Sequence, residues 1–106
     1  MVTETQPNDL ADRLAAGEPL TLLDVREHWE VEHAAIDGIL HIPMGEVVAR
    51  REEIPDDRPL VCVCHHGMRS AQVAAYLEQQ GWTGVENLSG GIDAWSQTVD
   101  PGIPRY

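Results

Sequence analysis

Apolar residues occur in short runs along this chain, and the runs are bounded by glycine, proline or acidic residues. Short, largely apolar runs between such breaks are typical of strands that are buried on both faces of a parallel sheet. The pattern predicts four strands, over residues 21–25, 39–42, 60–64 and 85–88. Between them, apolar residues at helical spacing predict helices near residues 8–16, 27–33, 44–51, 70–80 and 92–97.

The alternation of strands with helices predicts parallel strands joined by right-handed crossovers, and therefore an α/β domain. With 106 residues, 42% of them hydrophobic, the chain has the size of one globular domain with a modest core. A polar lead over residues 1–6 precedes the first helix, and a tail over residues 98–106 contains two prolines and is expected along the surface. Residues 1–106 are thus predicted to form a single domain.

The net charge of −11 narrows the range of partners. The chain has seven arginines, no lysine and 18 acidic residues. Neither nucleic acid nor an anionic membrane is therefore an expected partner. Small anions are also repelled at long range, so any anion site has to be built locally. No apolar run approaches the roughly 20 residues of a membrane span, and no secretory signal pattern is visible. We therefore expect a cytoplasmic protein, and a monomer because no long apolar stripe remains after the core is assigned.

The most informative segment is the predicted strand over residues 60–64, which ends at Cys64 and is followed by a short loop and a helix. In open α/β sheets, sites form at the carboxyl ends of strands, and the start of a helix favours an anion. Because the thiolate is the nucleophilic form of cysteine, Cys64 is the candidate nucleophile. Cys62 lies within the strand between two valines, so we expect it to be an inert core residue.

The loop after Cys64 contains the candidate residues for binding an anion. Arg69 stands at the start of a helix, where the helix dipole disfavours a cation, so we expect it to serve a bound anion or the rim of the loop. Ser70 is expected to cap the helix or to donate to the anion. His65 and His66 are most simply exposed, with unknown roles. The candidate binding loop consists of His65, His66, Gly67, Met68, Arg69 and Ser70.

Asp24 and Arg26 follow the first predicted strand, at the same edge of the sheet as Cys64. We expect them to pair and to brace that edge, which is a supporting role. Cys62 and Cys64 lie on one face of their strand and two histidines follow them, which raises the question of a metal site. Because no second cluster of cysteine or histidine completes a zinc-binding spacing, we expect neither a metal nor another cofactor.

Four segments resemble, in order and spacing, the motifs of single-domain rhodaneses, which are sulfurtransferases. The resemblance implies a rhodanese-like fold, a five-stranded parallel sheet flanked by helices. It also implies that Cys64 attacks the outer sulfur of a donor, thiosulfate or a persulfide, and that the loop N–H groups cradle the resulting Cys64 persulfide. Cyanide or a thiol, including a protein thiol, would then accept the sulfur. The segments are residues 22–27 (LLDVRE), Gly38 with residues 41–43 (HIP), residues 64–70 (CHHGMRS) and residues 88–95 (LSGGIDAW).

Two other classes of function stay open at this point. A cysteine phosphatase uses a loop with five residues between its cysteine and arginine, whereas Cys64 and Arg69 are separated by four. The shorter loop suits a single sulfur better than a phosphoryl group, and the same argument applies to arsenate reduction. A rhodanese-like binding module without catalysis is the remaining alternative, although some such modules have lost the cysteine that this chain retains.

Overall fold

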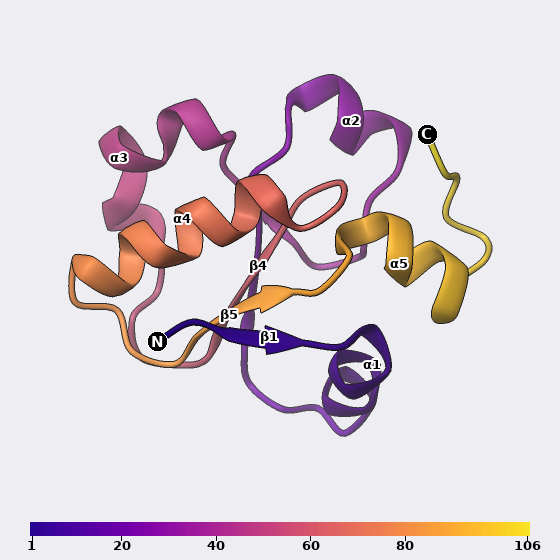
Figure 1. The fold of residues 1–106 in the computed structure, drawn as a ribbon, viewed down its shortest axis with the longest axis horizontal. Coiled ribbons are helices and arrows are strands. Elements are labelled where there is room, and N and C mark those ends of the chain that lie inside the picture. The colour runs from indigo at the N-terminus through magenta and orange to yellow at the C-terminus, as the bar shows by residue number, and fades with distance from the viewer.

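A computed structural model describes all 106 residues, and it shows a five-stranded parallel sheet with helices on both faces (Figure 1). The order of strands across the sheet is β1-β5-β4-β2-β3, which places β4 at the centre. The predicted α/β fold is thereby confirmed. The strands are β1 (Thr3–Thr5), β2 (Thr21–Asp24), β3 (Leu40–His41), β4 (Leu60–Val63) and β5 (Val85–Leu88).

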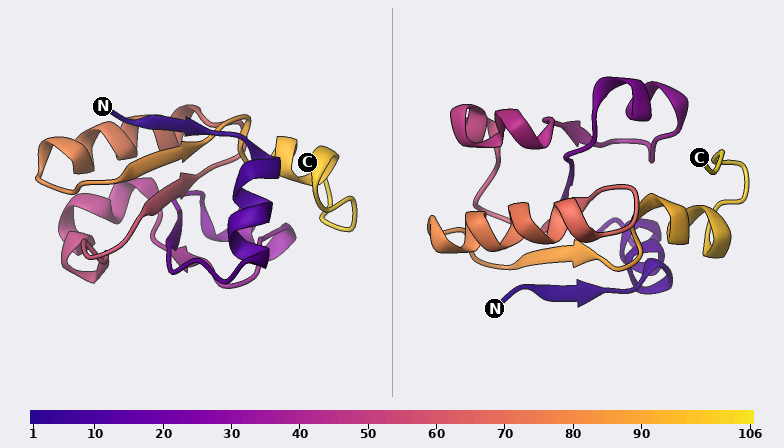
Figure 2. Two further views of the ribbon diagram at one scale, coloured as in Figure 1. Left: turned by 90° about the horizontal axis from the view of Figure 1, so that it is seen from below. Right: turned by 45° about the horizontal axis from the view of Figure 1, so that its top comes forward.

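Helices cover the two faces of this sheet in pairs, as the rotated views show (Figure 2). Helices α1 (Pro7–Ala15) and α5 (Gly91–Thr98) cover one face, and α3 (Val47–Arg50) and α4 (Met68–Gln79) cover the other. The short helix α2 (His28–His33) follows β2, and the 3₁₀ turns η1 (Met44–Glu46) and η2 (Arg51–Glu53) flank α3. No helix of the structure combines the length and the apolar character needed to cross a bilayer.

The side chains of β4 alternate between two hydrophobic clusters, one on each face of the sheet. Leu60 and Cys62 belong to a cluster of 12 residues that includes the apolar side of α4. Val61 and Val63 belong to a cluster of nine residues with α1 and α5. All four side chains are fully buried, as expected for a central parallel strand that has helices on both faces.

The N-terminal segment differs from the sequence expectation. Residues 1–6 read as a polar lead, but the structure places β1 there, in parallel register with β5 so that Thr3 is opposite Glu86. An edge strand with one face exposed needs no apolar run, and so the pattern of residues 3–5 gave no strand signal. Helix α1 begins at Pro7, because proline fits the first helical position, where its missing N–H has no partner to lose.

Candidate functional site

Cys64 follows the last residue of β4, and the loop after it folds back over the sulfur. The residue is 1% exposed. The backbone N–H of Gly67 donates to Cys64 Sγ at 3.0 Å, and α4 begins at the next residue, Met68. Gly67 adopts a φ of +101°, a left-handed conformation that glycine reaches without strain. The turn therefore aims a backbone donor at the sulfur, where it favours an anionic form.

The first turn of α5 fixes the beginning of this loop. The N–H of Ile92 donates to the carbonyl oxygen of Cys64 at 2.9 Å, and the N–H of Asp93 donates to that of His65 at 3.1 Å. This contact requires Gly91, because a Cβ there would stand 2.5 Å from the Cys64 oxygen and closer still to the His65 oxygen. The segment of residues 88–95 thus acts on the site through the backbone of the loop.

A chain of polar contacts leads from Cys64 to β1. The Ser70 hydroxyl lies 3.2 Å from Cys64 Sγ and 2.5 Å from Asn87 Oδ1. The amide nitrogen of Asn87 donates to the carboxylate of Glu4, at 3.0 and 3.1 Å, and to the carbonyl of Gly67 at 3.1 Å. Because the hydroxyl has one proton, Ser70 donates to one neighbour at a time. The shorter contact places that proton toward Asn87.

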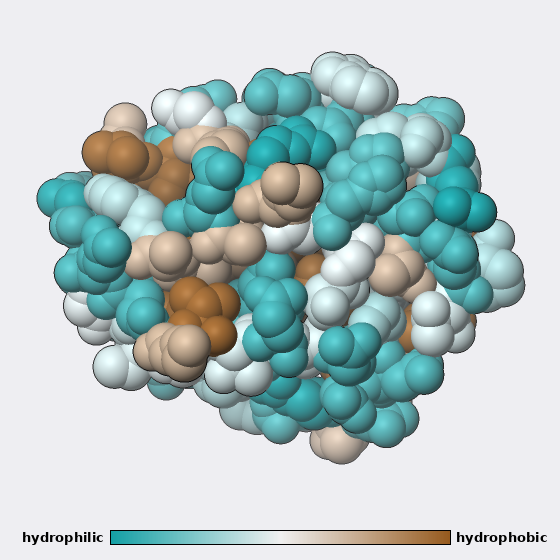
Figure 3. All heavy atoms as spheres, viewed as in Figure 1, coloured by the Kyte–Doolittle hydropathy of each residue, from teal (hydrophilic) through white to brown (hydrophobic).

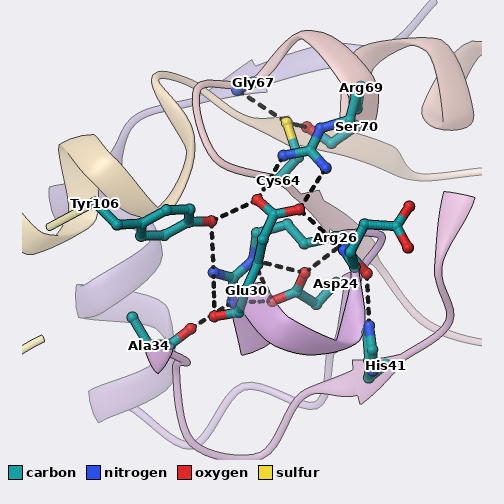
Figure 4. Close-up of polar contacts among 11 residues, drawn as sticks. Asp24, Arg26, Glu30, Ala34, His41, Cys64, Gly67, Arg69, Ser70 and Tyr106 are labelled. Atoms are coloured by element: carbon teal, nitrogen blue, oxygen red, sulfur yellow. Dashed lines mark hydrogen bonds and ion pairs between the residues drawn. The ribbon is translucent and has the colours of Figure 1, made fainter. Parts of the chain in front are cut away.

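Asp24 and Arg26 form the ion pair that the sequence suggested, and both side chains are fully buried. The guanidinium donates to the Asp24 carboxylate at 2.7 to 3.1 Å and to the carbonyl oxygen of Ala34 at 2.7 Å. Burial opposes the charge of Arg26, but the hydrogen bonds that it donates to Asp24 and Tyr106 outweigh this effect and raise the pKa of the guanidinium. The pair connects the end of β2 to the segment after α2 (Figure 4).

Glu30 stands at the centre of the polar network and joins three elements (Figure 4). Both terminal nitrogens of Arg69 donate to its carboxylate, at 2.7 and 2.8 Å. The Tyr106 hydroxyl donates to Glu30 Oε2 at 2.7 Å and accepts from Arg26 at 2.9 Å. The bonds from Arg69, which exceed the opposing effect of burial, lower the pKa of Glu30 to about 2. Glu30 is therefore a buried carboxylate that neutralises the loop arginine.

Tyr106 comes from the tail, which lies along the surface as expected, and its ring packs on the loop. Its ring stacks on His65 with centroids 3.9 Å apart, and the ring of His66 stacks on the other side of His65 at 4.0 Å. Burial raises the pKa of Tyr106 to about 12; the hydrogen bond to Glu30 acts in the same direction and the bond from Arg26 opposes it. His65 is thus half-buried between two rings and His66 is exposed, which corrects the expectation that both are exposed.

His65, His66 and Asp93 form a cluster whose ligand atoms lie within 4.8 Å of one another. The two imidazole rings are nearly parallel, with an interplanar angle of 15°. A metal ion bonds to a ring nitrogen close to the plane of its ring, so one ion cannot lie in the planes of two stacked rings. Asp93 also accepts hydrogen bonds from Arg105 and Gln97. The residues as placed do not fit a metal ion.

The remaining candidates divide between those that face Cys64 and those that do not. Ser70 and the N–H of Gly67 contact the sulfur, whereas Met68 lies on the outside and is 76% exposed. Sequence reasoning missed four residues whose roles depend on contacts between distant parts of the chain. Only the capping-box spacing of Glu27 and Glu30 gave a local signal, for the start of α2. The missed residues are Glu4, Glu30, Asn87 and Tyr106.

Comparison with known proteins supports the resemblance. A family model described as a rhodanese-like domain matches residues 6–98. A sulfurtransferase from Allochromatium vinosum is 43% identical over 97 residues, covering 92% of this chain and 91% of that protein. The putative sulfurtransferase YtwF from Bacillus subtilis is 37% identical over 100 residues, covering 94% of this chain and 96% of that protein. A rhodanese-related protein from Thermoplasma volcanium superposes with a TM-score of 0.85 at 28% identity, covering 98% of this chain and 99% of that one.

Proposed function

This chain belongs to the rhodanese-like domain family, and on that premise we propose that it transfers a sulfane sulfur through a persulfide on Cys64. The donor is thiosulfate or a persulfide, and the acceptor is cyanide or a thiol, either of a small molecule or of a protein. We propose the cytoplasm as the compartment, because free Cys62 and Cys64 suit a reducing environment.

The observation that carries the proposal is the placement of Cys64 Sγ, 3.0 Å from the Gly67 N–H and next to the first turn of α4. In the first half-reaction, the thiolate forms a bond to the outer sulfur of the donor. The donor's S–S bond breaks, and its electron pair leaves with sulfite or with a thiolate. In the second half-reaction, the acceptor attacks the outer sulfur of the Cys64 persulfide and Cys64 regains its thiolate. This is covalent catalysis with double-displacement kinetics.

The surroundings of Arg69 argue against phosphoryl chemistry at the same loop. Arg69 is separated from Cys64 by four residues, and both of its terminal nitrogens are bound to Glu30. A phosphatase loop needs its arginine free to hold two oxygens of the phosphoryl group. Because that role of the guanidinium is already taken by Glu30, sulfur transfer is the better-supported function. The thiol at Cys64 likewise argues against a purely non-catalytic module.

Sulfur transfer to cyanide tests the proposal, with thiosulfate and cysteine persulfide as alternative donors. We expect thiocyanate to form with at least one donor, with parallel double-reciprocal plots, and Cys64→Ser to abolish it. Cys62→Ser is the matched control, because Cys62 is fully buried and burial raises the pKa of its thiol to about 12. Full activity in Cys64→Ser, or loss of activity only in Cys62→Ser, would contradict the assignment.

A further inference from the structure

The arginines of this chain are almost all neutralised by carboxylates. The protein has seven arginines and no lysine, and Arg51 is the one arginine whose bonds go to uncharged side chains, those of Tyr76 and Gln80. The other six are paired with Asp or Glu: Arg13, Arg26, Arg50, Arg58, Arg69 and Arg105. Much of the face shown in Figure 3 is hydrophilic.

Arg69 is the arginine of the loop that follows Cys64, and Figure 4 shows its guanidinium on the same side of the loop as the Cys64 side chain. Its partner Glu30 has a side chain that is 4% exposed, and the two are joined at 2.7 and 2.8 Å. Because Glu30 is buried, solvent does not screen it from the loop as it would a surface carboxylate. The net charge of this pair at the site is zero. The pair therefore adds no net charge to the positive potential that the loop N–H groups and the start of α4 offer a substrate, about half an elementary charge for a helix end.

The two donor classes place different charges on this site. With thiosulfate, Cys64–S⁻ + ⁻S–SO₃⁻ gives Cys64–S–S⁻ + SO₃²⁻, and the reacting groups carry three negative charges throughout. With an alkyl persulfide, Cys64–S⁻ + R–S–SH gives Cys64–S–SH + R–S⁻. In both cases the thiolate takes the outer sulfur and the donor's S–S electron pair leaves with the inner group. In the persulfide reaction, however, the reacting groups carry one negative charge.

We propose that Cys64 takes its sulfur from an alkyl persulfide in preference to thiosulfate, and that Glu30 sets this preference by cancelling the charge of Arg69. The inference rests on the proposed sulfur transfer through Cys64. Glu30 is a specificity-determining residue in this account, acting through Arg69 without touching the sulfur. The overall charge of −11 works in the same direction, because it lowers the rate at which a dianion meets the protein.

The experiment measures persulfide formation on Cys64 by intact mass in single turnovers, with sodium thiosulfate and with cysteine persulfide as the donors. Glu30→Gln retains an acceptor for Arg69 and removes the negative charge. We expect the ratio of the thiosulfate rate to the cysteine persulfide rate to rise about tenfold in this variant. Glu53→Gln is the matched control, because it removes the same charge from an exposed pair with Arg50, and the ratio should stay at the wild-type value.

Ionic strength gives a second readout on the wild-type protein alone, which decides the question even where Glu30→Gln fails to fold. The thiosulfate rate should increase several-fold between about 0.01 M and about 0.15 M salt, because screening relieves repulsion of the dianion. The rate with zwitterionic cysteine persulfide should change little. An unchanged donor ratio in folded Glu30→Gln, or equal salt dependence for the two donors, would overturn the inference. Modification of Cys64 by neither donor would instead overturn the proposed function.

Discussion

The carboxylate of Glu30 in α2 holds both terminal nitrogens of Arg69 in α4, at 2.7 and 2.8 Å. The two residues are 39 positions apart, and their pair joins the segment after β2 to the segment after β4. The same carboxylate accepts from Tyr106 and from the N–H of Glu27. One buried anion therefore organises the loop arginine, the start of a helix and the C-terminal segment.

Glu30 should make the protein acid-labile. Its pKa is about 2 in the folded protein against an ordinary 4.5. Its stabilising contribution is therefore complete above about pH 5 and is lost as the pH falls toward 2, because the unfolded chain takes up the proton first. The loss amounts to about 3 kcal/mol. Urea unfolding at stepwise lower pH should show this slope in wild type and a shallower one in Glu30→Gln. Equal slopes would contradict the expectation.

Tyr106→Phe should destabilise the protein by about 1–3 kcal/mol, because two buried charged groups, Arg26 and Glu30, each lose one of their hydrogen bonds. The ring stack on His65 is retained, so the loss reports the hydroxyl. Tyr76→Phe is the control, since the Tyr76 hydroxyl contacts only the exposed Arg51, and it should change stability by less than about 0.5 kcal/mol. Thermal and urea unfolding measure both. Equal effects of the two substitutions would show that the network around Glu30 does not depend on Tyr106.

Gly91→Ala should disrupt the Cys64 loop, because the new Cβ would overlap the carbonyl oxygens of Cys64 and His65. Gly38→Ala is the matched control: Gly38 also has a positive φ, +81°, but a Cβ there meets no atom within 4 Å. Both variants carry the backbone strain, so the difference between them isolates the overlap, which we expect to cost at least about 2 kcal/mol. Sulfur transfer should fall in Gly91→Ala alone. Similar stability and activity in the two variants would remove the role given to α5.

Asn87→Ala should lower the stability of the protein and, as a separate effect, change the reactivity of Cys64. It removes the side-chain partner shared by the Gly67 carbonyl and the Ser70 hydroxyl and should cost about 1–3 kcal/mol, whereas Asn8→Ala at an exposed position of α1 should cost almost nothing. The freed Ser70 proton then turns to Cys64, so alkylation of Cys64 by iodoacetamide at neutral pH should accelerate. The acceleration should disappear in a Ser70→Ala background. Its persistence there would assign the effect to a loosened loop.

The strand that precedes Cys64 could be predicted because its signal is local. Residues 60–64 form an apolar run bounded by polar loops, and the motif of residues 64–70 lies within one turn of the next helix. The ion pair of Asp24 and Arg26 could be predicted for the same reason, because the two residues are close together in the sequence. The sequence order also sufficed for the α/β class, since a parallel sheet needs only alternating strand and helix signals.

The rest of the site depends on contacts that no local pattern encodes. Tyr106 reaches Glu30 across 76 positions, and Ser70 reaches Asn87 across 17. Glu4 acts only because β1 joins β5, and β1 is an edge strand without an apolar run. The pairing of Arg69 with Glu30 shows the same limit, since the position of Arg69 at a helix start identified it as unusual but did not identify its partner.

A persulfide on Cys64 can be detected from the intact mass of the protein after a brief reaction with cysteine persulfide or thiosulfate, followed by removal of the donor. We expect a mass increase of one sulfur atom, located by peptide mapping on Cys64, that disappears when cyanide is added and never forms in Cys64→Ser. Wild-type protein that gains no sulfur from either donor, or that carries it on Cys62, would contradict sulfur transfer through Cys64.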